Sequence, residues 1–125
     1  MTDEIYQDFI LELYKNPVNF GKIDGALHAQ SYNPLCGDRI EFFIKTDGDR
    51  VVEAKFIGSG CAISQASASL LTEEIKGKTV GQLEKMDVKD VLRMIQIDLS
   101  RNPSRLKCAL LSLETLKKAI KDNDD

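Results

Sequence analysis

The 125-residue sequence has little of what membrane-spanning, nucleic-acid-binding and secreted proteins contain. No apolar run approaches the roughly 20 residues that a membrane-spanning helix needs. Basic residues are not in excess, and a formal net charge of -3 argues against nucleic-acid binding. The acidic N-terminus lacks the basic and then apolar order of a signal peptide. We therefore expect a cytoplasmic protein that binds neither nucleic acid nor a membrane.

Cysteine is scarce as well, and histidine occurs once. Three cysteines are an odd number that cannot all pair within one chain, and thiols stay reduced in the cytoplasm. The Cys-x-x-Cys spacing of zinc ribbons and thioredoxin-type motifs is absent. Three thiols in a reducing compartment indicate a metal or sulfur site rather than a disulfide framework.

The length and the ordinary composition predict a single domain over residues 1–125, with a frayed polar tail at 122–125. Apolar spacing and turn residues predict a helix at 3–14, strands at 26–32, 39–45 and 51–57, and helices at 61–76, 79–86, 88–99 and 104–120. Gly48 suits a tight hairpin between the second and third strands. The predicted fold class is α+β, with a three-stranded antiparallel sheet packed by about five helices.

The cysteines fall at boundaries between these elements. Cys36 lies in the turn between the first two strands, and Cys61 lies where the third strand turns through Gly58 and Gly60 into a helix. Antiparallel pairing places both turns at the same end of the sheet. A helix N-terminus favours an anion, and a thiolate at Cys61 is one. Cys108, near the first turn of the last helix, joins them only if that helix begins at the same end.

Asp38 follows Cys36 closely enough to point to the same centre. Three thiolates and one carboxylate form a tetrahedral set for zinc, or four terminal ligands for a two-iron cluster. Simpler roles exist for the same residues: Cys108 as an apolar filler between leucines, and Asp38 as a turn former. His28 lies in the middle of a strand, which favours a structural or surface role over metal ligation.

Other possible sites are less well supported. The serines at positions 64, 67 and 69 have no catalytic base near them in the sequence. The segment Gly58-Ser59-Gly60 lacks the lysine pattern of a phosphate-binding loop. A non-enzymatic interaction domain with incidental cysteines is a further alternative.

Several segments resemble the IscU/SufU/NifU N-terminal family of iron–sulfur cluster assembly proteins. The resemblance covers nearly the whole chain and is carried by Asn33–Asp38, Gly58–Ser69, Lys76–Lys78 and Arg105–Ala109, with Tyr14–Pro17 matching an early Tyr-x-Asn-Pro segment. It implies a SufE/NifU-like α+β fold. It also implies that the metal is held by Cys36, Asp38, Cys61 and Cys108.

The function implied by the resemblance is that of a non-enzymatic scaffold. A cysteine desulfurase would deliver sulfur to Cys108, with Cys61 as the alternative acceptor. The chain would hold iron or a labile [2Fe-2S] cluster and pass it to apo iron–sulfur acceptor proteins. A homodimer around a shared cluster is an additional expectation.

The alternative is a SufU-type zinc-dependent sulfur acceptor that activates a cysteine desulfurase and would count as a sulfurtransferase. Lys107 occupies the position where the IscU branch has a histidine, which favours this alternative. The short run from Lys76 to Cys108 lacks the insertion of SufU proteins, which favours the scaffold. IscU proteins carry Leu-Pro-Pro-Val-Lys as the recognition site of an Hsp70-type chaperone. The matching segment Arg101–Arg105 keeps one proline, which argues against transfer through that chaperone.

Overall fold

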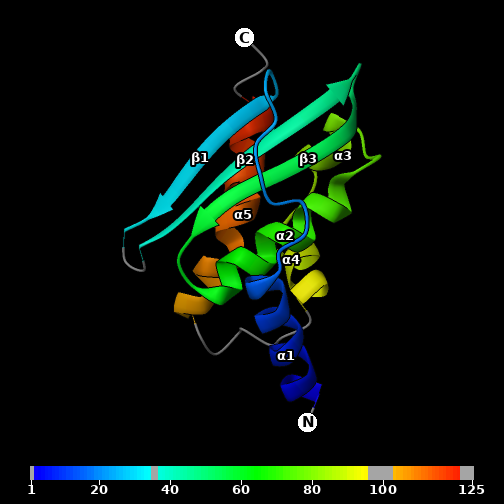
Figure 1. Cartoon of the computed structure of the whole chain (residues 1–125). Helices are drawn as coiled ribbons and strands as arrows, with labels where there is room; N and C mark the ends of the chain where they lie inside the picture. The colour runs from blue at the N-terminus through cyan, green and yellow to red at the C-terminus, as the bar shows by residue number, and fades with distance from the viewer. Residues whose placement is uncertain (1, 35–36, 96–102, 122–125) are drawn as a thin grey trace.

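The computed structural model describes residues 2–34, 37–95 and 103–121 (Figure 1). The elements in chain order are α1 (Thr2–Lys15), β1 (Leu27–Asn33), β2 (Asp38–Asp47), β3 (Arg50–Ser59), α2 (Ala62–Ile75), α3 (Val80–Glu84), α4 (Val88–Ile95) and α5 (Pro103–Lys121). The predicted α+β class, with three antiparallel strands and five helices among these residues, is confirmed.

Most predicted bounds agree with the structure, and the differences come from the ends of elements. β2 is longer than predicted, because pairing with both neighbours extends it from Asp38 to Asp47. α5 begins at Pro103, so Cys108 lies in its second turn, close to the first turn as predicted. The predicted helical residues 96–99 and the predicted frayed tail lie outside the described residues.

The sheet has the strand order β1-β2-β3, and both pairs are antiparallel. At one end of the sheet Asn33 pairs with Asp38, and Arg39 pairs with Ser59. At the other end Gly48, with φ of +66°, begins the predicted hairpin between β2 and β3. The end of β1, the start of β2 and the end of β3 therefore share one edge of the molecule.

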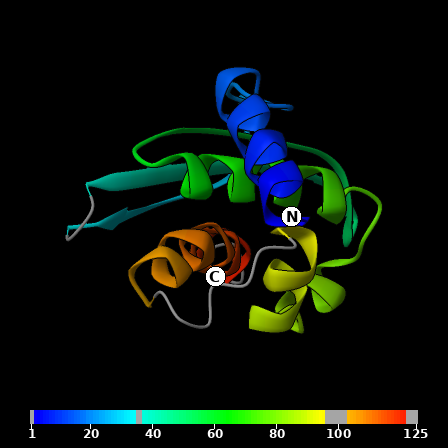
Figure 2. The same cartoon turned by 90° about the horizontal axis from the view of Figure 1, so that it is seen from below.

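One face of the sheet carries the hydrophobic core. Side chains alternate along a strand, and the buried set of β2 includes Ile40, Phe42 and Ile44, opposite Ala54 and Phe56 of β3. α5 packs against β1 and β2, whereas α2 packs against β3 and α5, as the view along the sheet shows (Figure 2). α1 contacts α2 and lies on the side of α2 that faces away from α5 (Figure 2).

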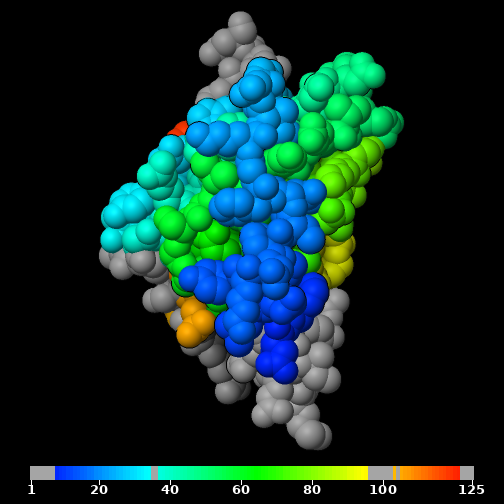
Figure 3. Space-filling view, viewed as in Figure 1, coloured from blue at the N-terminus to red at the C-terminus, as the bar shows by residue number. Residues whose placement is uncertain are grey.

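A short segment after α1, Val18–Gly21, runs along the free edge of β3, and we call it the strap. The Phe56 amide donates to the Asn19 carbonyl at 3.0 Å, and the Gly21 amide donates to the Phe56 carbonyl at 2.8 Å. In the space-filling view, the N-terminal part of the chain, in blue, passes over the middle of the face of the molecule that is turned toward the viewer (Figure 3). The strap thus joins the N-terminal segment to β3.

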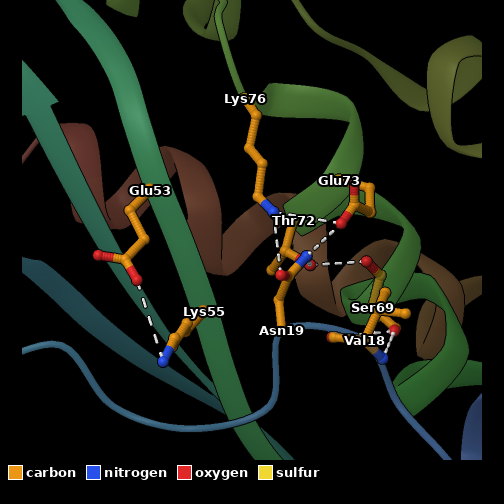
Figure 4. A network of polar contacts seen from close by, with 8 residues as sticks. All are labelled: Val18, Asn19, Glu53, Lys55, Ser69, Thr72, Glu73 and Lys76. Atoms are coloured by element: carbon orange, nitrogen blue, oxygen red, sulfur yellow. Dashed lines mark hydrogen bonds and ion pairs between the residues drawn. The ribbon is translucent and has the colours of Figure 1, made fainter.

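The Asn19 side chain fixes the strap to α2 (Figure 4). Its Nδ2 donates to Thr72 Oγ1 at 3.1 Å and to Glu73 Oε1 at 2.9 Å, and its Oδ1 accepts from Lys76 Nζ at 3.0 Å. The Ser69 hydroxyl accepts from the Val18 amide at 2.8 Å. Asn19 has φ of +58°, a conformation that asparagine tolerates better than most residues.

Candidate metal centre

Asp38 is fully buried at the first position of β2, at the edge where β3 ends. Its Oδ1 accepts a hydrogen bond from the Cys61 amide at 2.7 Å, and its Oδ2 lies 3.5 Å from Cys61 Sγ. A buried carboxyl group needs such partners, because burial without them is unfavourable. Asp38 therefore links β2 to the start of α2 and is not merely a turn former.

Gly60 allows the backbone to pass this close to Asp38. Its φ is +122°, a conformation that residues with a side chain rarely adopt. A Cβ atom at this position would lie 2.1 Å from Asp38 Oδ1 and 2.7 Å from Asp38 Cα. Gly60 thus shapes the carboxylate side of the site, a role that the sequence pattern alone does not indicate.

Cys61 is the N-cap residue of α2, with φ of -74° and ψ of 158°. Its own side chain makes no capping hydrogen bond in the described structure, and the Asp38 carboxylate accepts from the Cys61 amide instead. The Ser64 hydroxyl donates to the Cys61 carbonyl at 3.0 Å and lies 3.8 Å from Cys61 Sγ. The thiol therefore lies at a helix N-terminus, between a carboxylate and a hydroxyl group.

Cys108 reaches the same place from α5, and its side chain is buried at 4% exposure. Close packing of α2 on α5 brings it there. The Ser67 hydroxyl donates to the Ala109 carbonyl at 2.8 Å and lies 3.1 Å from the Ser112 hydroxyl. The sequence alone does not indicate this contact, because it depends on how two separate helices cross.

The three described candidate ligands converge. One donor atom each from Asp38, Cys61 and Cys108 all lie within 4.8 Å of one another. Tetrahedral coordination with metal–sulfur bonds of about 2.3 Å places ligand atoms about 3.8 Å apart. A contraction of about 1 Å therefore suffices for one ion, and two thiolates with one carboxylate are a donor set that suits zinc or iron.

The fourth predicted ligand, Cys36, lies outside the described residues, as do Arg101 and Asn102 of the segment compared with the chaperone site. His28 is on the exposed side of β1, where it bonds to Glu41 and stacks on Phe43 with ring centroids 4.9 Å apart. This position agrees with the surface role expected for the histidine.

Lys107 is exposed beside Cys108 and borders an open groove of about 440 Å³ between α5 and the end of β1. Tyr32 and Asn33 line the β1 side, and Leu110 and Glu114 line the α5 side. Lys107, the position at which the IscU branch has a histidine, thus borders a groove and is next to the buried Cys108 in the sequence.

Comparison with known families agrees with this architecture. Residues 5–125 match the family described as NifU-like N terminal domain. The chain belongs to this family. None of the helices within the described ranges is long and apolar enough to cross a membrane.

This NifU-like chain has relatives in both the SufU branch and the IscU branch. It is 38% identical to the zinc-dependent sulfurtransferase SufU of Bacillus subtilis, over 94% of this chain and 90% of the relative. It is also 38% identical to the iron-sulfur cluster assembly scaffold protein IscU of Thermotoga maritima, over 94% of this chain and 93% of the relative.

A solved structure of an iron–sulfur cluster assembly protein is similar to this chain as well. The crystal structure from Fervidobacterium islandicum, assigned as an iron-sulfur cluster assembly scaffold protein for the SUF system, is 32% identical and has a TM-score of 0.79. The match covers 96% of this NifU-like chain and 99% of that structure. The resemblance to the IscU, SufU and NifU proteins is thereby confirmed.

Proposed function

We propose that this protein is a scaffold for iron–sulfur cluster assembly. It accepts sulfur from a cysteine desulfurase, holds a labile [2Fe-2S] cluster as cargo and passes it to apo acceptor proteins in the cytoplasm. The observation that carries the proposal is the convergence of Asp38, Cys61 and Cys108 from three separate elements, with donor atoms within 4.8 Å. Cys36 is the fourth ligand of the proposed set.

Asp38 has two functions in this proposal. Oδ1 is held by the Cys61 amide, so Oδ2 is the oxygen available to a metal. A carboxylate is a harder ligand than a thiolate and binds iron of a cluster less strongly than sulfur does. Asp38 therefore makes the cargo easier to release, and it also caps the N-terminus of α2.

The thiols differ in access to an incoming sulfur. Cys108 is buried, whereas Cys61 is partly exposed. The family resemblance favours Cys108 as the acceptor, but a desulfurase persulfide reaches Cys61 without movement of α5. The acceptor thiolate attacks the outer sulfur of the persulfide, a new S–S bond forms, and the desulfurase cysteine leaves as a thiolate. Mass analysis of Cys61→Ser and Cys108→Ser after a single transfer identifies the acceptor.

The deciding experiment is anaerobic iron and sulfide analysis after reconstitution, with wild type beside Asp38→Ala and Asp38→Asn. Asparagine keeps an oxygen that can accept from the Cys61 amide, whereas alanine removes both the cap and the ligand. We expect equal amounts of iron and sulfide in the wild type and a longer-lived cluster in both variants. If neither substitution changes cluster lifetime or transfer, the ligand role of Asp38 is wrong.

A second function is favoured by the similarity to the zinc-dependent sulfurtransferase of Bacillus subtilis and by Lys107. In that case the same four residues hold zinc, which keeps the thiols as thiolates until a ligand is exchanged. The protein then carries sulfur and activates a desulfurase without iron. Stoichiometric zinc that survives chelators after anaerobic purification supports this carrier, whereas visible absorption after reconstitution supports the scaffold.

A homodimer that shares one cluster is the alternative to four ligands from one chain. The mass of the reconstituted protein in solution distinguishes them, because a shared cluster gives one cluster for two chains. Loss of the cluster should then return the protein to a monomer.

A further inference from the structure

We propose that the Ser64 hydroxyl is a positioning group for the metal site, because it donates a hydrogen bond to the thiolate of Cys61 when metal is bound. This inference rests on the proposed metal site. It assigns a role to a buried serine that has no place in the ligand set itself.

The observation is the position of one hydroxyl between two acceptors. Ser64 is fully buried in the first turn of α2. Its Oγ lies 3.0 Å from the Cys61 carbonyl and 3.8 Å from Cys61 Sγ. In the described structure the hydroxyl donates to the Cys61 carbonyl, and Cys61 Sγ is a second group that the same hydroxyl can reach.

In the metal-free protein the Cys61 thiol is itself a donor. Its S–H faces Asp38 Oδ2 at 3.5 Å and Ser64 Oγ at 3.8 Å, while the Ser64 hydroxyl donates to the Cys61 carbonyl. A cysteine binds a metal ion as its thiolate. The sulfur can then only accept a hydrogen bond.

The Ser64 hydroxyl can change its acceptor without leaving another group unpaired. The Cys61 carbonyl also accepts from the Gln65 amide at 3.2 Å, so it keeps a partner when the hydroxyl turns to Sγ. A small rotation of a short side chain is enough for this change. Without Ser64, the half-buried thiolate of Cys61 loses a possible hydrogen-bond donor, which is unfavourable.

A donor of this kind changes the electronic properties of the metal–thiolate bond. Hydrogen bonds from residues around the ligands orient them and tune the metal. Donation to Cys61 Sγ withdraws charge from the sulfur, which weakens its donation to the metal. We expect charge transfer from the thiolate to the metal to require more energy with Ser64 than without it.

The test uses Co²⁺ as the probe, added anaerobically to the metal-free full chain. The variant is Ser64→Ala, and the control is Ser69→Ala, a buried serine on the same helix whose hydroxyl contacts the strap at Val18. We expect the thiolate-to-cobalt charge-transfer band to move to longer wavelength in Ser64→Ala and to remain in place in Ser69→Ala. Ser64→Thr, which keeps a hydroxyl, should restore the wild-type band.

Three results overturn the proposal. An unchanged charge-transfer band in Ser64→Ala shows that the Ser64 hydroxyl makes no hydrogen bond to the sulfur. An equal shift of the band in Ser69→Ala shows that the shift is a general effect of lost packing. A band in Ser64→Thr that matches Ser64→Ala shows that the hydroxyl is not the cause. A wild type without any thiolate charge transfer is a different failure, because it overturns the proposed metal site together with the role of Ser64.

Discussion

At the scale of single residues, the backbone of Gly60 lies so close to Asp38 that there is no room for a side chain at position 60. A β-carbon on residue 60 would overlap the Asp38 carboxylate, and the positive φ of this residue strains any amino acid that has a β-carbon. We predict that Gly60→Ala lowers the free energy of unfolding by about 2–4 kcal/mol and abolishes metal binding, because the overlap displaces the adjoining backbone of Cys61 and, with it, a thiolate ligand of the site. Chemical denaturation and metal titration measure the two effects.

Gly48→Ala is the matched control for that substitution. Gly48 also has a positive φ, but nothing lies within 4 Å of the position of an added β-carbon. It should lose about 1–2 kcal/mol from the backbone alone and keep the metal affinity of the wild type. Equal metal loss in both variants would show that the close contact with Asp38 is not the cause.

The side-chain amide nitrogen of Gln65 is a second feature at the residue scale that affects stability. Its side chain is 5% exposed, and Nε2 has no hydrogen-bond partner among the described residues. A buried donor without a partner costs about 1–3 kcal/mol. We predict that Gln65→Met, which has a similar volume and no donor, raises the free energy of unfolding by about 1–2 kcal/mol. Urea denaturation of both proteins checks this, and a less stable variant contradicts it.

Among the elements, the strap depends on Asn19 for both its backbone conformation and its side-chain bonds. Asn19→Gly keeps the positive φ and removes the bonds to Thr72, Glu73 and Lys76. Asn19→Ala removes the bonds and also strains the backbone. We predict losses of stability of about 1 and 2 kcal/mol, respectively, with faster hydrogen exchange at the Phe56 amide. Equal losses would mean that the backbone conformation contributes nothing.

The same contact between strap and helix gives a dependence on pH. The hydrogen bond from Asn19 and then that from Lys76 hold the pKa of Glu73 below its ordinary value. A lowered pKa in the folded state contributes stability above the unfolded pKa and loses it as the pH falls through the folded value.

Glu73→Gln keeps an acceptor oxygen for Asn19 and removes the charge. We predict that wild type is more stable than this variant at neutral pH, by a small amount because the side chain is over half exposed. The difference should disappear as the solution is acidified below the ordinary carboxyl range. Denaturation curves at a series of pH values test the sign, and a difference that grows in acid contradicts it.

For the molecule as a whole, the proposed ligands connect three elements that are far apart in the sequence. Asp38 comes from β2, Cys61 from the start of α2, and Cys108 from α5. A metal that binds the folded state therefore stabilises the entire fold. At a free metal concentration of 100 times Kd, we predict a gain of about 2.7 kcal/mol and a rise in Tm of about 10 °C.

Thermal unfolding with zinc and with a chelator measures this gain. Cys61→Ser should lose most of the rise in Tm. His28→Gln is the control, because His28 lies on the exposed side of the sheet and pairs with Glu41. A rise in Tm that depends on His28 and not on Cys61 would place the metal elsewhere.

The sequence was sufficient to determine the elements and the end of the sheet where the site lies. Alternating apolar residues give strands, a short glycine-containing turn gives the hairpin, and antiparallel connections place Asp38 and Cys61 at one edge. These features are local or follow from connectivity, so they need no knowledge of side-chain packing.

Tertiary packing decided the rest, because it brings together groups that are distant along the chain. Cys108 approaches Cys61 only through the crossing of α5 and α2, with Ser67 against Ala109. Asp38 becomes a helix cap only because Gly60 lets the backbone pass beside it. Such contacts depend on distances of a few ångströms between separate elements, and periodicity and motif spacing carry no information about these distances.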